Sequence, residues 1–204
     1  DQPQWSSFEK LEDAFSFAEK VGFPVLVRPS FVLSGAAMAV ATDRVMLENY
    51  LDSAVGTTHS SVVISKFERN SKEVEFDGVA QDGEIIVSAI GEHIENAGVH
   101  SGDATIVLPP QNLYLETVRR VRRVAQKLAK SLNISGPFNI QFLAKENHIK
   151  VIECNLRASR SFPFVSKVLD QNFIDIATRI WMGEKMENQE LNLLDIRDVG
   201  VKAA

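Results

Sequence analysis

The chain has 204 residues, of which 45% are hydrophobic and 24% are charged. These proportions are typical of globular proteins and predict a packed core in one large domain or two small ones. No apolar run approaches the roughly 18 residues of a membrane helix, and the first residues lack the apolar stretch of a signal peptide. We therefore predict no membrane partner and expect a cytoplasmic protein.

Acidic residues exceed basic ones, with 27 Asp and Glu against 22 Lys and Arg and a net charge of -5. This balance gives no general attraction to nucleic acid, so we predict no nucleic-acid partner. The single cysteine, Cys154, excludes an internal disulfide and a zinc site built from cysteines of this chain. The chain begins with Asp1 rather than methionine, and we expect it to be part of a longer protein.

The first third of the chain alternates between predicted helices and strands. Apolar spacing predicts helices over residues 8–21 and 43–54, and short apolar runs predict strands over 24–28 and 61–67. Arg28 and Lys66 lie at the ends of these strands, from which a cation can reach a phosphate group. A surface cation with no ligand is the alternative interpretation. A loop of small residues is expected at 34–37.

Strict alternation over residues 72–80 predicts a strand with Glu73, Glu75 and Asp77 on one face. The turn signal at residues 82–83 makes residues 72–90 a predicted β-hairpin. Glu73 could accept hydrogen bonds from ribose hydroxyls, although an acid on a strand usually faces solvent. Residues 92–103 hold two histidines and three acids, but their spacing favours a glycine-flanked binding loop over a zinc site.

A long amphipathic helix is predicted over residues 112–132, with its arginines on a solvated face. A second hairpin follows, with strands over 138–142 and 149–155 that place Gln141 opposite Glu153 and Asn139 opposite Asn155. Helices over 161–169 and 173–181 complete the pattern.

The second hairpin carries side chains that are suited to bind magnesium. Glu153 offers a carboxylate, and Gln141 and Asn155 offer amide oxygens, which suits Mg²⁺ bound together with a nucleotide triphosphate. Arg157 and Arg160 follow at once, and guanidinium groups favour phosphoryl or carboxylate partners. A satisfied polar network at the edge of the hairpin is the alternative.

Four stretches, taken in order, resemble the ATP-grasp domain of the carbamoyl phosphate synthetase large chain. They are Val27–Gly35 (VRPSFVLSG), His93–Asp103 (HIENAGVHSGD), Phe138–Phe142 (FNIQF) and Ile152–Lys167 (IECNLRASRSFPFVSK). The resemblance implies an α+β class and an ATP-grasp fold, in which two α/β subdomains hold a nucleotide between antiparallel sheets. The smaller subdomain would span about 20–70 and the larger 71–185, with 186–204 beginning the following linker.

The resemblance also implies roles for individual residues. Arg28 and Lys66 would contact phosphates, Glu68 would lie on the hinge that meets adenine, and Glu73 would hold ribose. The nucleotide pocket would be lined by Gly98, Val99, His100 and Ser101. Mg²⁺ or Mn²⁺ would be bound by Gln141, Glu153 and Asn155, and the transferring phosphoryl group or carbamate would be steadied by Arg157 and Arg160.

The sequences of residues 97–103 and 162–167 are similar to those of the second, carbamate-phosphorylating half of that enzyme. The implied activity is phosphorylation of carbamate by ATP to give carbamoyl phosphate. The alternatives are the bicarbonate-phosphorylating half and an ATP-binding fragment that is inactive in isolation. Ser34-Gly35 and Leu156 depart from the bacterial pattern and are similar to the eukaryotic one.

The resemblance further implies that the remaining synthetase domains and a glutaminase domain or subunit are partners. The parent enzyme would serve either pyrimidine synthesis or the arginine and urea pathway. In the latter case the mitochondrial matrix would be its location.

Overall fold

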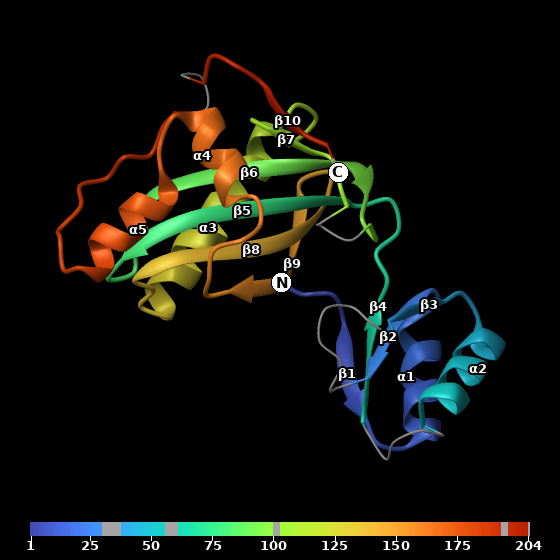
Figure 1. Cartoon of the computed structure of the whole chain (residues 1–204). Helices are drawn as coiled ribbons and strands as arrows, with labels where there is room; N and C mark the ends of the chain where they lie inside the picture. Colours follow the sequence, from blue (N-terminus) through green and yellow to red (C-terminus); the bar gives the residue numbers. More distant parts are fainter. Residues whose placement is uncertain (30–37, 56–60, 100–102, 193–195, 204) are drawn as a thin grey trace. The chain divides into compact units, whose positions relative to one another are not determined.

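The computed structural model describes residues 1–29, 38–55, 61–99, 103–192 and 196–203. The chain divides into two compact units (Figure 1). The N-terminal unit spans Gln2–Arg69, and the C-terminal unit spans Asn70–Ala204 together with Asp1. None of the helices in these described ranges is long and apolar enough to cross a bilayer.

The N-terminal unit is a four-stranded antiparallel sheet in the order β1-β4-β2-β3, packed against two helices. Its elements are β1 (Trp5–Phe8), α1 (Leu11–Val21), β2 (Val25–Pro29), β3 (Ala39–Ala41), α2 (Arg44–Val55) and β4 (Val62–Lys66). Alternate residues of β2 and β4, among them Val25, Val27 and Ile64, share one core with Ala18 of α1 and Leu47 of α2. This core fixes the positions of the strand ends that carry Arg28 and Lys66.

The C-terminal unit is a six-stranded antiparallel sheet in the order β10-β7-β6-β5-β8-β9, with helices on both faces (Figure 1). Its strands are β5 (Lys72–Gln81), β6 (Glu84–Asn96), β7 (Ile106–Leu108), β8 (Gly136–Lys145), β9 (His148–Asn155) and β10 (Gly200–Lys202). Helix α3 (Leu115–Ser131) packs on one face, while α4 (Phe162–Leu169) and α5 (Phe173–Trp181) pack on the other.

The central strand β5 separates two cores because its side chains alternate. Val74 and Phe76 pack with α3, while Val79 packs with α4 and α5 on the opposite face. Glu73, Glu75 and Asp77 have the same parity as Val79 and therefore lie on the α4/α5 face. The predicted pairing of Gln141 with Glu153 and of Asn139 with Asn155 is confirmed by the register of β8 and β9.

Two element boundaries differ from the sequence prediction. Phe8 ends strand β1, where it pairs with Val62, and the helix begins only at Leu11. Pairing with a strand more than fifty residues away overrides the local helical spacing. Strand β6 continues to Asn96, so His93 lies on a strand rather than in the predicted binding loop.

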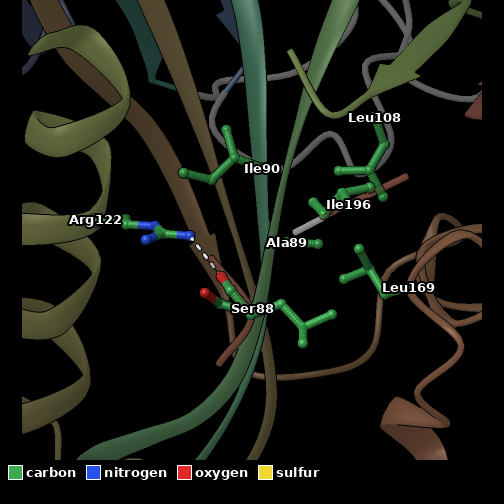
Figure 2. A pocket seen from close by; sticks show the side chains of 8 residues that line it. Ser88, Ala89, Ile90, Leu108, Arg122, Leu169 and Ile196 are labelled. Atoms are coloured by element: carbon green, nitrogen blue, oxygen red, sulfur yellow. Dashed lines mark hydrogen bonds between the residues drawn. The ribbon is translucent and has the colours of Figure 1, made fainter. Parts of the chain in front are cut away.

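Described residues of the segment 186–204, where we predicted the start of a linker, pack along the sheet of the C-terminal unit. Gln189 N donates to Ile86 O at 2.7 Å, and β10 pairs with β7. A cavity of about 10 Å³ lies beside β6, and Figure 2 shows the side chains that line it. Two of its lining residues are joined by a hydrogen bond, in which Arg122 Nη2 of α3 donates to Leu191 O at 3.4 Å. The cavity has room for about one water molecule and is too small for a substrate.

Candidate functional site

Two rows of polar side chains cross the sheet of the C-terminal unit on the α4/α5 face. Strand register aligns Glu75, Gln141 and Glu153 in one row and Asp77, Asn139 and Asn155 in the next. Neighbouring residues in each row lie directly opposite each other on β5, β8 and β9, so their side chains share a face. The structure thus brings together the predicted residues Gln141, Glu153 and Asn155.

The acidic groups of β5 are buried, with exposed fractions of 7% for Glu73, 4% for Glu75 and 2% for Asp77. The alternative interpretation, in which Glu73 faces solvent as an acid on a strand usually does, is therefore wrong. The alternation of one strand shows which side chains share a face, but it does not show what covers that face. Burial of these carboxyl groups has to be offset by hydrogen bonds or by a cation.

Asp77 is the centre of a buried hydrogen-bond network. Its Oδ1 accepts from Asn139 Nδ2 at 2.8 Å and from Ser159 Oγ at 2.6 Å, and its Oδ2 accepts from Ser161 Oγ at 2.5 Å. Burial raises the pKa of Asp77 to about 6, although the hydrogen bonds from both serines lower it. Burial thus favours the neutral form of this carboxyl group, and the hydrogen-bond network opposes that shift by stabilising the carboxylate.

Glu75 links this network to strand β6. His93 Nε2 lies 3.2 Å from Glu75 Oε1, and Ser161 Oγ, which donates to Asp77, also lies 2.9 Å from Glu75 Oε2. His93 is 1% exposed. His93 was not among the residues predicted for the site. A register shift between Val79 and Ala80 makes Gly91 rather than Ile90 the partner of Glu75, and a bulge of this kind cannot be read from the turn. Among the described residues no group of three or more His, Cys, Asp or Glu side chains could hold a metal by itself.

The outer end of the first row carries an exposed carboxylate. Glu153 Oε1 accepts from Asn155 Nδ2 at 2.8 Å, and Gln141 lies opposite on β8. Burial is the largest cause that raises the pKa of Glu73; His93 lowers it, and the charges of Glu75 and Glu153 raise it further. Glu73 and Glu153 are thus close enough to repel each other. The carboxylate of Glu153 and the amide oxygens of Gln141 and Asn155 form a donor set that fits a hard divalent cation such as Mg²⁺.

Arg157 and Arg160 lie exposed on the segment between β9 and α4. Arg157 Nη1 donates to Ala158 O at 3.2 Å, and in the described parts of the chain neither guanidinium forms an ion pair. An arginine near acidic rows that still has no acidic partner keeps its charge available for an anion.

Three predicted residues belong to the N-terminal unit. Arg28 is exposed on β2, and Glu68 follows β4. Lys66 Nζ donates to Gly22 O at 2.7 Å and to Phe23 O at 3.2 Å. The ammonium group is thus held at the end of α1, with its stem along the strand, and its predicted contact with phosphate stays a prediction.

Gly98 and Val99 follow β6, and both are exposed. Gly98 has φ 117°, a backbone conformation that favours glycine, and Ala97 and Val99 form an isolated bridge around it. His100 and Ser101 lie outside the described residues, as does the small-residue loop with Ser34 and Gly35.

This architecture matches solved structures of the ATP-grasp class. The chain is similar to the biotin carboxylase domain of the 2-oxoglutarate carboxylase from Hydrogenobacter thermophilus, with a TM-score of 0.73 and 21% identity. The match covers 91% of this chain and 43% of that one. The chain therefore has an ATP-grasp fold, which confirms the predicted fold class.

The family is defined by the sequence. The family model described as "Carbamoyl-phosphate synthase L chain, ATP binding domain" matches residues 3–189, and the chain belongs to this family. It is 56% identical over 184 residues to the multifunctional protein URA2 of Saccharomyces cerevisiae, covering 90% of this chain and 8% of that protein. It is 48% identical over 195 residues to the human mitochondrial carbamoyl-phosphate synthase [ammonia], covering 95% of this chain and 13% of that protein. The chain thus spans a small part of the length of both relatives.

Proposed function

We propose that the chain is a catalytic domain of a carbamoyl phosphate synthetase that phosphorylates carbamate with ATP and Mg²⁺. The observation that carries this proposal is the pair of polar rows across β5, β8 and β9, followed by two guanidinium groups that form no ion pair with the described residues. Family membership supports the proposal. The solved carboxylase domain with a similar fold was crystallised with MgADP and bicarbonate, which supports a nucleotide, a magnesium ion and a small carbon acid as ligands.

The metal would be held by Glu153, Gln141 and Asn155, and Mn²⁺ would satisfy the same oxygen donors. When bound, the cation neutralises charge on the phosphate oxygens. The nucleotide roles follow from the resemblance: Arg28 and Lys66 would contact phosphates, Glu68 would meet adenine, and Glu73 would hold ribose. The pocket would be lined by Gly98, Val99, His100 and Ser101.

In the reaction, an oxygen of carbamate attacks the γ-phosphorus of ATP. The new O–P bond forms as the bond from phosphorus to the bridging oxygen breaks, and that electron pair leaves with ADP. Carbamate reacts as the anion, so no proton has to be removed. Arg157 and Arg160 would stabilise the negative charge that spreads over the transferring phosphoryl group.

The bicarbonate-phosphorylating half is the second candidate. The sequences of residues 97–103 and 162–167 favour carbamate as the substrate. The names of the relatives do not distinguish the carbamate half from the bicarbonate half. The substrates differ in one testable respect. The reverse of carbamate phosphorylation makes ATP from carbamoyl phosphate and ADP, whereas bicarbonate phosphorylation is followed by the release of ADP when bicarbonate is added.

The test is Glu153→Gln in the full-length protein. We expect ATP formation from carbamoyl phosphate and ADP to fall by about 100-fold or more, because the metal is the largest local charge, while bicarbonate-dependent ADP release continues. The opposite pattern would assign the chain to the bicarbonate half. Two unchanged rates, with weaker nucleotide binding, would identify a binding domain without chemistry of its own.

The partners of the whole protein follow from the same proposal. They are the remaining synthetase domains and a glutaminase domain or subunit that supplies nitrogen. The cytoplasm is the proposed location, and the mitochondrial matrix applies if the parent serves the urea pathway, as the name of the human relative illustrates.

A further inference from the structure

The segment of residues 156–161 carries Arg157 and Arg160 and joins β9 to α4. Its first end is fixed because Asn155 pairs with Asn139 in the β8/β9 register. Its second end is fixed by side chains, since Ser159 and Ser161 both bind Asp77. The segment is thus anchored on the two sides of its arginines.

The anchor at Asp77 has the geometry of a two-point clamp. Each carboxylate oxygen takes one serine hydroxyl, at 2.6 Å for Ser159 and 2.5 Å for Ser161. Ser161 N also donates to Ser159 Oγ at 3.2 Å, so the two serines are held to each other. Asp77 lies on β5, which has strands paired on both sides, and Asn139 Nδ2 fixes the carboxylate from β8.

Filling a buried position with a carboxylate costs free energy of desolvation. The desolvation of one charged group costs several kcal/mol, and an apolar side chain at such a position is often as stable or more stable. Directional hydrogen bonds provide what apolar packing lacks, which is a defined position for the partner backbone. The clamp therefore contributes geometry to the segment that it holds.

The arginines have few contacts of their own to define their position. Arg157 donates to the neighbouring carbonyl of Ala158, and Arg160 has no hydrogen bond or ion pair with any described residue. The placement of both guanidinium groups consequently depends on the backbone between Asn155 and Ser161.

We propose that Ser159 and Ser161 are positioning residues, which use Asp77 as an anchor to hold Arg157 and Arg160 toward the transferring phosphoryl group. This inference rests on the proposed function. Transition-state charge is stabilised only by donors that are already in place, and a displacement of about 1 Å can cost about 100-fold in rate. Loss of the clamp should therefore lower kcat more than it weakens nucleotide binding.

The experiment uses the full-length protein with the double substitution Ser159→Ala and Ser161→Ala. We expect kcat for ATP formation from carbamoyl phosphate and ADP to fall by about 10- to 100-fold, with KM for ADP changed by less than about twofold. Ser159→Thr keeps a hydroxyl at the first clamp point and should retain most of the rate. Thr117→Val is the matched control, because it removes a fully buried hydroxyl that donates to Glu146 O on the α3 side of the sheet.

A second readout needs no substrate. Trypsin cleaves after arginine, so a released segment should be cut after Arg157 or Arg160 several times faster in the double variant, measured by mass spectrometry on nucleotide-free protein. The Thr117→Val variant should be cut at the wild-type rate.

The clamp would be overturned if the wild-type protein is active and the double variant has the same kcat and the same rate of trypsin cleavage. The proposed function would then still stand. Equal losses in kcat and in ADP binding, which indicate general damage, would have the same two consequences. A wild-type protein that makes no ATP from carbamoyl phosphate would overturn the proposed function, and the trypsin rates would still judge the clamp.

Discussion

At Asp77, burial and hydrogen bonding act in opposite directions on the pKa of one side chain. It is 2% exposed and accepts three hydrogen bonds from neutral donors, yet burial still raises its pKa from the ordinary value of 3.8 to about 6. The folded chain therefore holds a proton on Asp77 more tightly than the unfolded chain does. Between these two pKa values the native state binds more protons, so its stability must fall as pH rises.

Replacement of Asp77 by Asn removes this titration and gives a direct measure of it. The free energy of unfolding of the wild type, relative to Asp77→Asn, should decrease from about pH 4 to about pH 6 and then level off. The expected total change is roughly 3 kcal/mol, at 1.36 kcal/mol per pKa unit. Urea denaturation of both proteins at several pH values provides the measurement, and a relative stability that rises over this range would contradict the sign.

At the scale of single elements, the alternation along β5 and β8 predicted much of the site. It placed Glu73, Glu75 and Asp77 on one face, and it paired Gln141 with Glu153. The clamp could not be predicted, because Ser159 and Asp77 are 82 residues apart and their contact depends on how α4 returns to the sheet. Short strands such as β3, β7 and β10 were also missed, since three residues carry no detectable period.

The start of β8 provides a stability test at this scale. Gly136 has φ 122°, and a Cβ there would lie 2.5 Å from Trp181 Nε1 of α5. Gly136→Ala should destabilise the chain by about 2–4 kcal/mol, through backbone strain and displacement of the indole that donates to Ser135 O.

Gly183 is the matched control for that substitution. It has φ 88°, but a Cβ there would meet nothing within 4 Å. Gly183→Ala should therefore cost only about 1 kcal/mol for the backbone conformation. Thermal unfolding of both variants checks the ranking, and equal losses at the two positions would show that contact with Trp181 contributes nothing.

For the whole molecule, two units with separate cores carry different parts of the proposed chemistry. The N-terminal unit presents the cations Arg28 and Lys66 at strand ends, and the C-terminal unit presents the metal-type oxygens and the clamped arginines. The sequence alone therefore predicted which chemical groups belong to the site, but it could not predict which part of a ligand each group contacts. Each group lies on a regular strand or next to one, whereas the ligand contacts of Lys66, Glu68 and Glu73 depend on how the chain holds a nucleotide.

The central claim is that Glu153, Gln141 and Asn155 bind a divalent cation together with a nucleotide. The most direct measurement is nucleotide binding by calorimetry with and without Mg²⁺, for the wild type, Glu153→Gln and the control Glu146→Gln. Glu146 is an exposed acid in the turn of the same hairpin, so its substitution changes the net charge equally. We expect the strengthening of binding by Mg²⁺ to shrink by about tenfold or more in Glu153→Gln and to persist in Glu146→Gln. An undiminished magnesium effect in Glu153→Gln would contradict the claim.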